Sequence, residues 1–322
     1  MFKKLNIRTL YIVFAVTLAV VLISKFINSR KGERTFKTQL VSIDSAGIAA
    51  IYLYPKAEEQ KEIRLTLTGG GRWQAEFGNI KSDADTGSVK GLISELLALK
   101  SQRLAATSKS QWKEYNVDDS TGTRIKVMTT GNSVAADIMI GRISFSQQTQ
   151  SATSYIRLHE EENVYAVEGF LPMSCNQKFE QWRNKVLIKG NKDNWTQLTY
   201  TYPGDSSFTI SKSNKKWMVN GVAGDSSKID QYLNTLSYQN GSGFIDNVNF
   251  KGQNPIYNLK IEGNNLPAPI LVRAFASDTV IKFVLNSSLN PDSYFNGTQS
   301  KLTENIFTSK AKLMSSDTTQ KP

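Results

Sequence analysis

The sequence holds one cysteine, Cys175, and one histidine, His159, among its 322 residues. One thiol cannot form an intramolecular disulfide, and one thiol with one imidazole falls short of the ligand set of a typical zinc site. Neither residue lies in a motif typical of a nucleophile or its base, and no G-x-x-x-x-G-K-[ST] phosphate-binding motif is present. We therefore expect no catalytic residues, no metal ion and no cofactor.

Long apolar runs are equally scarce, and residues 10–23 form the single one. With its neighbours it predicts a transmembrane anchor at residues 9–27, since a span needs roughly 17–25 residues. A cytoplasmic tail at 1–8 and a juxtamembrane linker at 28–42 would flank it. A cleaved signal peptide is the alternative, but residues 24–28 lack the small side chains of a good cleavage site.

The positive charge is concentrated near this run. Residues 1–37 carry eight Lys or Arg and one acidic residue, whereas the remaining 285 residues carry 31 basic and 27 acidic groups. A nucleic-acid-binding protein needs the basic excess on its folded domain, so no nucleic-acid partner is expected. The cluster suits anionic lipid instead. Basic residues flank the run on both sides, so charge alone leaves the orientation open. The short tail and long body favour a body on the periplasmic side.

The sequence after the linker predicts a body of two similar units, residues 43–190 and 191–314, followed by a disordered tail at 315–322. Several segments recur at an offset that falls along the chain from 148 to 116. These matches join 52–55 to 200–203, 63–65 to 208–210, Trp73 to Trp217, 89–96 to 229–236, and 164–179 to 280–295. Loop-length differences would produce such a steady drift.

Each unit has the pattern of an α+β fold. Ile63, Leu65 and Leu67 alternate with polar residues, which predicts a strand with one buried face. Three glycines then supply a hairpin turn, and apolar residues at helical spacing follow in residues 89–99. Further strands are expected after the helix. We therefore predict an N-terminal transmembrane helix followed by two repeated units of mainly antiparallel sheet, each with a covering helix.

The order of these motifs resembles the bacterial family called domain of unknown function 4340, over most of residues 45–300. The segments that carry the resemblance are 112–117 (WKEYNV), 140–142 (IGR), 155–157 (YIR), 164–167 (VYAV) and 182–187 (WRNKVL). The resemblance implies a membrane-anchored accessory protein encoded beside gliding-type ABC-transporter components, with its body outside the cytoplasmic membrane. It implies transporter subunits as partners and supplies no catalytic residues.

Trp182, Arg183 and Trp112 are the candidate interaction residues, because Trp and Arg are enriched at binding hot spots. The opposing interpretation packs Trp182 between the two units and pairs Arg183 with a carboxylate. An envelope module that binds glycans or peptides through exposed aromatic rings is the alternative function. A carboxylate-dependent envelope hydrolase, with acids such as those of residues 160–162, is a third.

Overall fold

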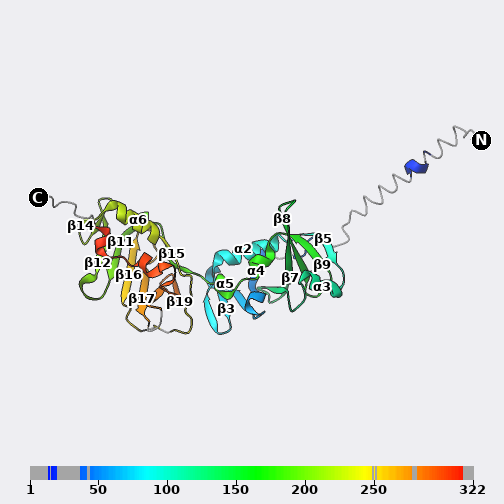
Figure 1. The fold of residues 1–322 in the computed structure, drawn as a ribbon, viewed down its shortest axis with the longest axis horizontal. Coiled ribbons are helices and arrows are strands. Elements are labelled where there is room, and N and C mark those ends of the chain that lie inside the picture. The colour runs from blue at the N-terminus through cyan, green and yellow to red at the C-terminus, as the bar shows by residue number, and fades with distance from the viewer. Residues whose placement is uncertain are drawn as a thin grey trace, which may run out of the picture.

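The computed structural model describes residues 14, 16–19, 37–41, 44–248, 250, 252–277 and 281–314. The expected cytoplasmic tail at 1–8, most of the expected anchor at 9–27, most of the expected linker at 28–42 and the expected disordered tail at 315–322 lie outside these residues. Among the helices of the described residues, none is long and apolar enough to cross a bilayer. The body consists of two lobes that lie end to end, each built on its own antiparallel sheet (Figure 1). We call them the first unit and the second unit.

The sheet of the first unit has nine strands in the order β4-β3-β2-β1-β6-β7-β8-β9-β5. All neighbours are antiparallel, so hairpins make most of the connections. The strands are β1 (Ile48–Tyr54), β2 (Ile63–Leu67), β3 (Trp73–Phe77), β4 (Ile80–Asp83), β5 (Ser101–Ala106), β6 (Thr123–Thr129), β7 (Val134–Ser146), β8 (Ser151–Leu158) and β9 (Val164–Glu168).

Helices cover one face of this sheet. The long helix is α2 (Thr86–Leu97), which buries Val89, Leu92 and Leu96 against the strands. Two short helices, α4 (Leu171–Cys175) and α5 (Phe179–Trp182), complete the same core. On the opposite face α3 (Trp112–Tyr115) covers a smaller apolar cluster around Met139.

The second unit has eight strands in the order β14-β13-β12-β11-β16-β17-β18-β19, again with antiparallel neighbours. A two-stranded ribbon of β10 and β15 packs beside them. The strands are β10 (Val186–Lys189), β11 (Trp195–Thr201), β12 (Phe208–Ser213), β13 (Lys216–Val219), β14 (Val222–Ala223), β15 (Tyr238–Asn240), β16 (Tyr257–Gly263), β17 (Ile270–Ala276), β18 (Phe283–Ser287) and β19 (Asn290–Asn296). The covering helices are α6 (Ser226–Leu236), α7 (Leu302–Ile306) and the 3-10 turn Lys310–Leu313.

The two sheets share one order over eight strands, with β1 in the place of β11 and β6 in the place of β16. The ninth strand of the first sheet, β5, has no counterpart in the second sheet. In each unit the long helix directly follows the strand at one edge of the sheet: α2 follows β4, and α6 follows β14. Asp85 and Asp225 begin these helices in the same way, because each carboxylate accepts amide hydrogen bonds from the first turn. The expected α+β class with mainly antiparallel sheets is confirmed.

The register of the first strands corrects one sequence match. Leu53 pairs with Ile63 on β2 and Ile125 on β6, and Tyr200 pairs with Phe208 and Leu259 at the corresponding places. The structural offset is therefore 147 rather than 148. Because side chains alternate between the faces of a strand, this shift of one residue places Tyr200 on the core face and Tyr52 on the opposite one.

The last sequence match is also wrong. It joins residues 164–179 to 280–295, and so places β9 on β18. By position in the sheets β9 corresponds to β19, because β8 and β18 each precede the final strand of the meander. Apolar strand patterns resemble one another, so the match selected the neighbouring strand.

Candidate functional site

The buried side chain of Arg183 joins the two units. Its backbone pairs with Ala84 just after β4, and its Nε donates to Ser82 Oγ at 3.1 Å. Its two terminal nitrogens donate to both oxygens of Asp246, in the second unit, at 2.8 and 2.9 Å. The guanidinium also lies 3.7 Å from the ring centroid of Phe244. A bidentate pair of this kind fixes direction as well as distance.

Backbone hydrogen bonds extend this junction on both sides. The amide of Asp85 donates to the carbonyl of Trp182 and the amide of Asn184 donates to that of Asp83, both at 2.8 Å. In the second unit the Asn290 side chain donates to the Asn184 carbonyl at 2.5 Å. The connecting segment is therefore held by both units over consecutive residues and forms a fixed joint.

The other two candidate interaction residues are buried. Trp182 is 3% exposed and belongs to the core of the first unit. Trp112 is 9% exposed, donates from Nε1 to the Glu162 carbonyl at 2.8 Å, and has the Arg157 guanidinium 3.7 Å above its ring. Neither ring offers the exposed face on which a glycan or peptide could stack. The structure places Trp182 and Arg183 side by side and Trp112 in a different cluster, on the opposite face of the sheet.

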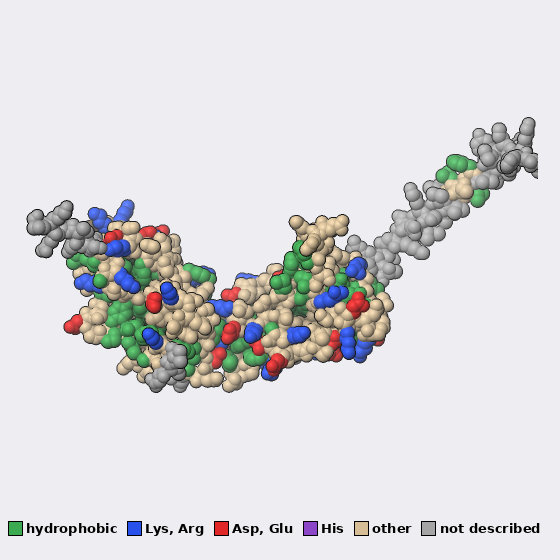
Figure 2. Space-filling model, in the orientation of Figure 1, with side chains coloured by type: hydrophobic (Ala, Val, Ile, Leu, Met, Phe, Trp, Pro, Cys, Tyr) green, Lys and Arg blue, Asp and Glu red, His purple; other side chains and the backbone are tan. Residues whose placement is uncertain are grey.

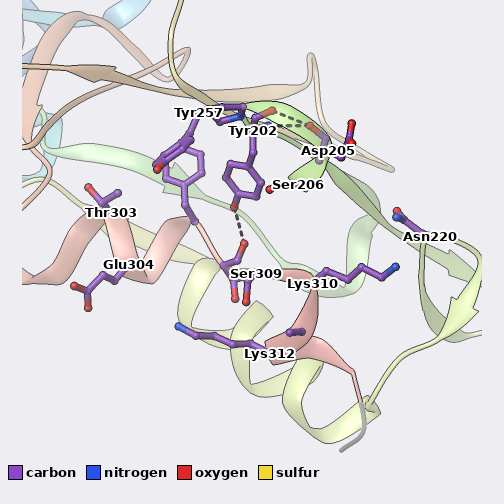
Figure 3. A pocket seen from close by; sticks show the side chains of 15 residues that line it. Tyr202, Asp205, Ser206, Asn220, Tyr257, Thr303, Glu304, Ser309, Lys310 and Lys312 are labelled. Carbon is purple, nitrogen blue, oxygen red and sulfur yellow. Dashed lines mark hydrogen bonds between the residues drawn. The ribbon is translucent and has the colours of Figure 1, made fainter.

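A hollow lies in the second unit, between the β11–β12 loop and the C-terminal segment 303–312. It is an open groove of about 750 Å³. Tyr202, Tyr257 and Phe307 form an aromatic wall, with Tyr202 and Tyr257 in an edge-to-face contact at 5.1 Å. In Figure 3 Asp205 and Ser206 lie on the loop side of these rings, and Lys310 and Lys312 come from the C-terminal segment.

Tyrosine hydroxyls hold the C-terminal segment against the sheet. Tyr202 donates to the carbonyl of Thr308 at 2.6 Å (Figure 3), and Tyr232 donates to that of Ile306 at 2.6 Å. Burial raises the pKa of Tyr202 and Tyr232 above that of a free phenol, so both hydroxyls stay protonated and act as donors. The groove thus has a rigid aromatic wall and charged lysines at its rim, which suits binding of an extended or ring-shaped ligand.

Among the residues that the structure describes, the single thiol and the single imidazole lie on opposite sides of the first sheet. Cys175 is fully buried in the first core, and this burial raises the pKa of its thiol, which keeps the thiol protonated and unreactive. His159 lies 3.4 Å from Glu160 on the other side of the sheet, near Tyr54 and Arg124. Glu161 forms an ion pair with Lys37 and accepts a hydrogen bond from Tyr165 at 3.0 Å.

The fold and the site define a class: an α+β protein built of two antiparallel sheets with one strand order, fixed end to end by a buried arginine. A family model described as "Domain of unknown function (DUF4340)" matches residues 78–260. That range covers more than half of the 322 residues, and the chain belongs to this family. No curated protein and no solved structure matches the chain.

Sequence reasoning missed the groove and the partner of Arg183. In the sequence Tyr202 stands out only as part of the repeat, and Tyr257 and Phe307 carry no motif of their own. Tyr202 directly follows β11, and Tyr257 begins the neighbouring strand β16. This proximity becomes apparent only once the pairing of β11 with β16 is known. Asp246 lies 63 residues from Arg183, in a segment without any regular pattern.

Proposed function

We propose that this chain is a non-catalytic, membrane-anchored accessory or scaffold protein of an ABC-type transport complex, with its body outside the cytoplasmic membrane. The apolar run at residues 10–23 supplies the anchor. The bidentate contact of Arg183 with Asp246 is the observation that carries the scaffold role. It makes the two units one stiff body, which can hold a docking surface at a fixed distance from the membrane.

The groove in the second unit is the docking surface in this proposal. Its aromatic wall resembles the buried anchors of protein interfaces. Its lining carries charges of both signs, Lys310 and Lys312 with Asp205 and Glu304, which favours a partner segment that also carries both signs. These aromatic and charged side chains suit the binding of a partner segment.

Co-purification of the full chain in mild detergent, with and without crosslinking, tests this function. We expect transporter membrane or ATPase subunits to be recovered with the wild-type chain and with a Lys189→Glu control, which changes an exposed lysine away from the groove. We expect the combined Lys310→Glu and Lys312→Glu variant to recover less. Failure to recover any transporter subunit, even after crosslinking, contradicts the proposal.

The same groove supports one other function, that of an envelope module for glycans or peptides. The observation in its favour is the wall of Tyr202, Tyr257 and Phe307, since such rings stack on sugar faces and on peptide side chains. A soluble envelope peptide or oligosaccharide that binds the detergent-solubilised chain, and loses affinity in the Lys310→Glu and Lys312→Glu variant, would favour this function over a transporter partner.

A further inference from the structure

Three large apolar side chains lie exposed together on the first unit. Phe145, Phe170 and Met173 are 59%, 53% and 60% exposed. Phe145 pairs across the β7–β8 hairpin with Ala152, whose carbonyl accepts the amide of Gly169 at 3.0 Å. The next residue is Phe170, and its carbonyl accepts the amide of Met173 at 2.8 Å. We call these three residues the apolar corner. Figure 2 shows apolar side chains at the base of the hairpin that projects from this unit.

The segments that form the apolar corner carry no charge. Residues 143–154, the outer part of the hairpin, consist of Ser, Thr, Gln, Ala, Ile and Phe. Residues 169–177 are also free of Asp, Glu, Lys and Arg. Charged side chains are costly near hydrocarbon, so segments without charge can enter the lipid interface without that cost. The exposed Phe145, Phe170 and Met173 then supply the apolar contact that an interfacial segment buries.

The chain reaches the body beside this corner. In the segment that leads in from the N-terminal side, Gln39 pairs with Lys100 and the carbonyl of Thr38 accepts the amide of Ser101 at 2.8 Å. Ser101 in turn pairs with Val167 on β9, three residues before Phe170. Residues 28–37 are all that separate Thr38 from residue 27, the end of the proposed anchor. The eleven steps from residue 27 to Thr38 span at most about 40 Å when fully extended.

We propose that the apolar corner lies in the headgroup region of the same bilayer that holds the N-terminal anchor. This inference rests on the proposed membrane anchor and adds a second lipid contact to it. Aromatic rings favour the interfacial zone, and one span plus one interfacial contact fixes the tilt of a body that a single tether would leave free to rotate. The second unit then extends away from that contact, with β14 at the opposite end of the molecule (Figure 1).

Depth-dependent quenching in proteoliposomes tests the contact on the full chain. Single cysteines replace Phe145 or Phe170 and carry an environment-sensitive dye, while the native Cys175 stays buried and unlabelled. Val222→Cys is the matched control, since Val222 is 56% exposed on β14. The vesicles contain phosphatidylethanolamine and phosphatidylglycerol, with nitroxide groups on the acyl chains near the headgroup. We expect at least about twofold stronger quenching at positions 145 and 170 than at 222.

Equal, weak quenching at all three positions overturns the inference. If the chain still resists alkaline extraction in that case, the anchor stands and only the apolar corner is wrong. If alkali releases the chain while the dye at positions 145 and 170 is quenched, the lipid contact holds and the anchor fails. Weak quenching in pure lipid together with shielding of the dye in native membranes would assign the corner to a protein partner and also overturn the inference.

Discussion

Replacing Asp246 with asparagine removes the charge that neutralises Arg183 and keeps the size of the side chain. The Arg183 side chain is 2% exposed, so its guanidinium cannot regain water without movement of the joint. Removing one member of a buried pair costs about 3–5 kcal/mol. The asparagine oxygen still accepts one hydrogen bond, and Asp246 is 29% exposed, so we expect a cost below that range, about 2–3 kcal/mol of unfolding free energy.

A second buried arginine supplies the control. Arg157 is 1% exposed and also contacts a carboxylate, Asp119, but that carboxylate is 78% exposed. Arg157 keeps two other acceptors, the carbonyls of Val117 and His159, at 3.1 and 2.6 Å. Asp119→Asn should therefore cost no more than about 1 kcal/mol.

Urea unfolding of the full chain in mild detergent, followed by tryptophan fluorescence, measures both variants. Trp182 adjoins the joint and Trp195 lies in the second core, so the fluorescence reports on both units. A spin-label distance between one site on each unit should broaden in Asp246→Asn and stay narrow in Asp119→Asn. If Asp246→Asn costs no more than Asp119→Asn and the distance distribution is unchanged, the fixed joint is refuted.

Three further outcomes follow from single side chains. Tyr202→Phe leaves the Thr308 carbonyl without its donor, so we expect a loss of about 1–3 kcal/mol and faster amide exchange in residues 302–314; unchanged exchange would contradict this. Cys175 should resist iodoacetamide in the folded chain and react once urea unfolds it. Burial opposes ionisation of Asp118, yet hydrogen bonds from Ser120 and its neighbours lower its pKa to about 2. The ionised Asp118 carboxylate should therefore stabilise the fold fully above about pH 3.9, the pKa of Asp in the unfolded chain, and this stabilisation should be lost as the pH falls toward 2. The difference in unfolding free energy between wild type and Asp118→Asn should disappear over the same pH range.

The strand pattern was readable from the sequence wherever one face of a strand is buried. Ile63 and Leu65 alternate with polar residues and do form the buried face of β2, and the helix expected from residues 89–99 is α2. Leu67, expected on the same face, is 36% exposed because it lies at the end of the strand. Local signals such as the glycine turn before Trp73 were also sufficient, because residues 70 and 71 adopt the positive φ angles that glycine tolerates.

What the sequence left open depends on contacts between distant residues. The registers of Tyr52 and Tyr200 differ by one residue from the sequence match, and only the strand pairing reveals it. Arg183 stands out in the sequence because it follows a tryptophan, a pair of residue types common at binding hot spots. Its partner Asp246 lies in no recognisable pattern, so the contact between them could not be predicted. The groove likewise forms only because the segment after β19 folds back and its Thr308 carbonyl accepts a hydrogen bond from Tyr202. No local sequence pattern predicts this contact.

The central claim is that the apolar run tethers a rigid body to the bilayer. Alkaline extraction of native membranes tests the tether most directly. We predict that the full chain stays in the membrane pellet at high pH, as proteins with a spanning helix do, because the proposed anchor at residues 9–27 would cross the hydrocarbon core. Release of the chain into the soluble fraction would contradict it.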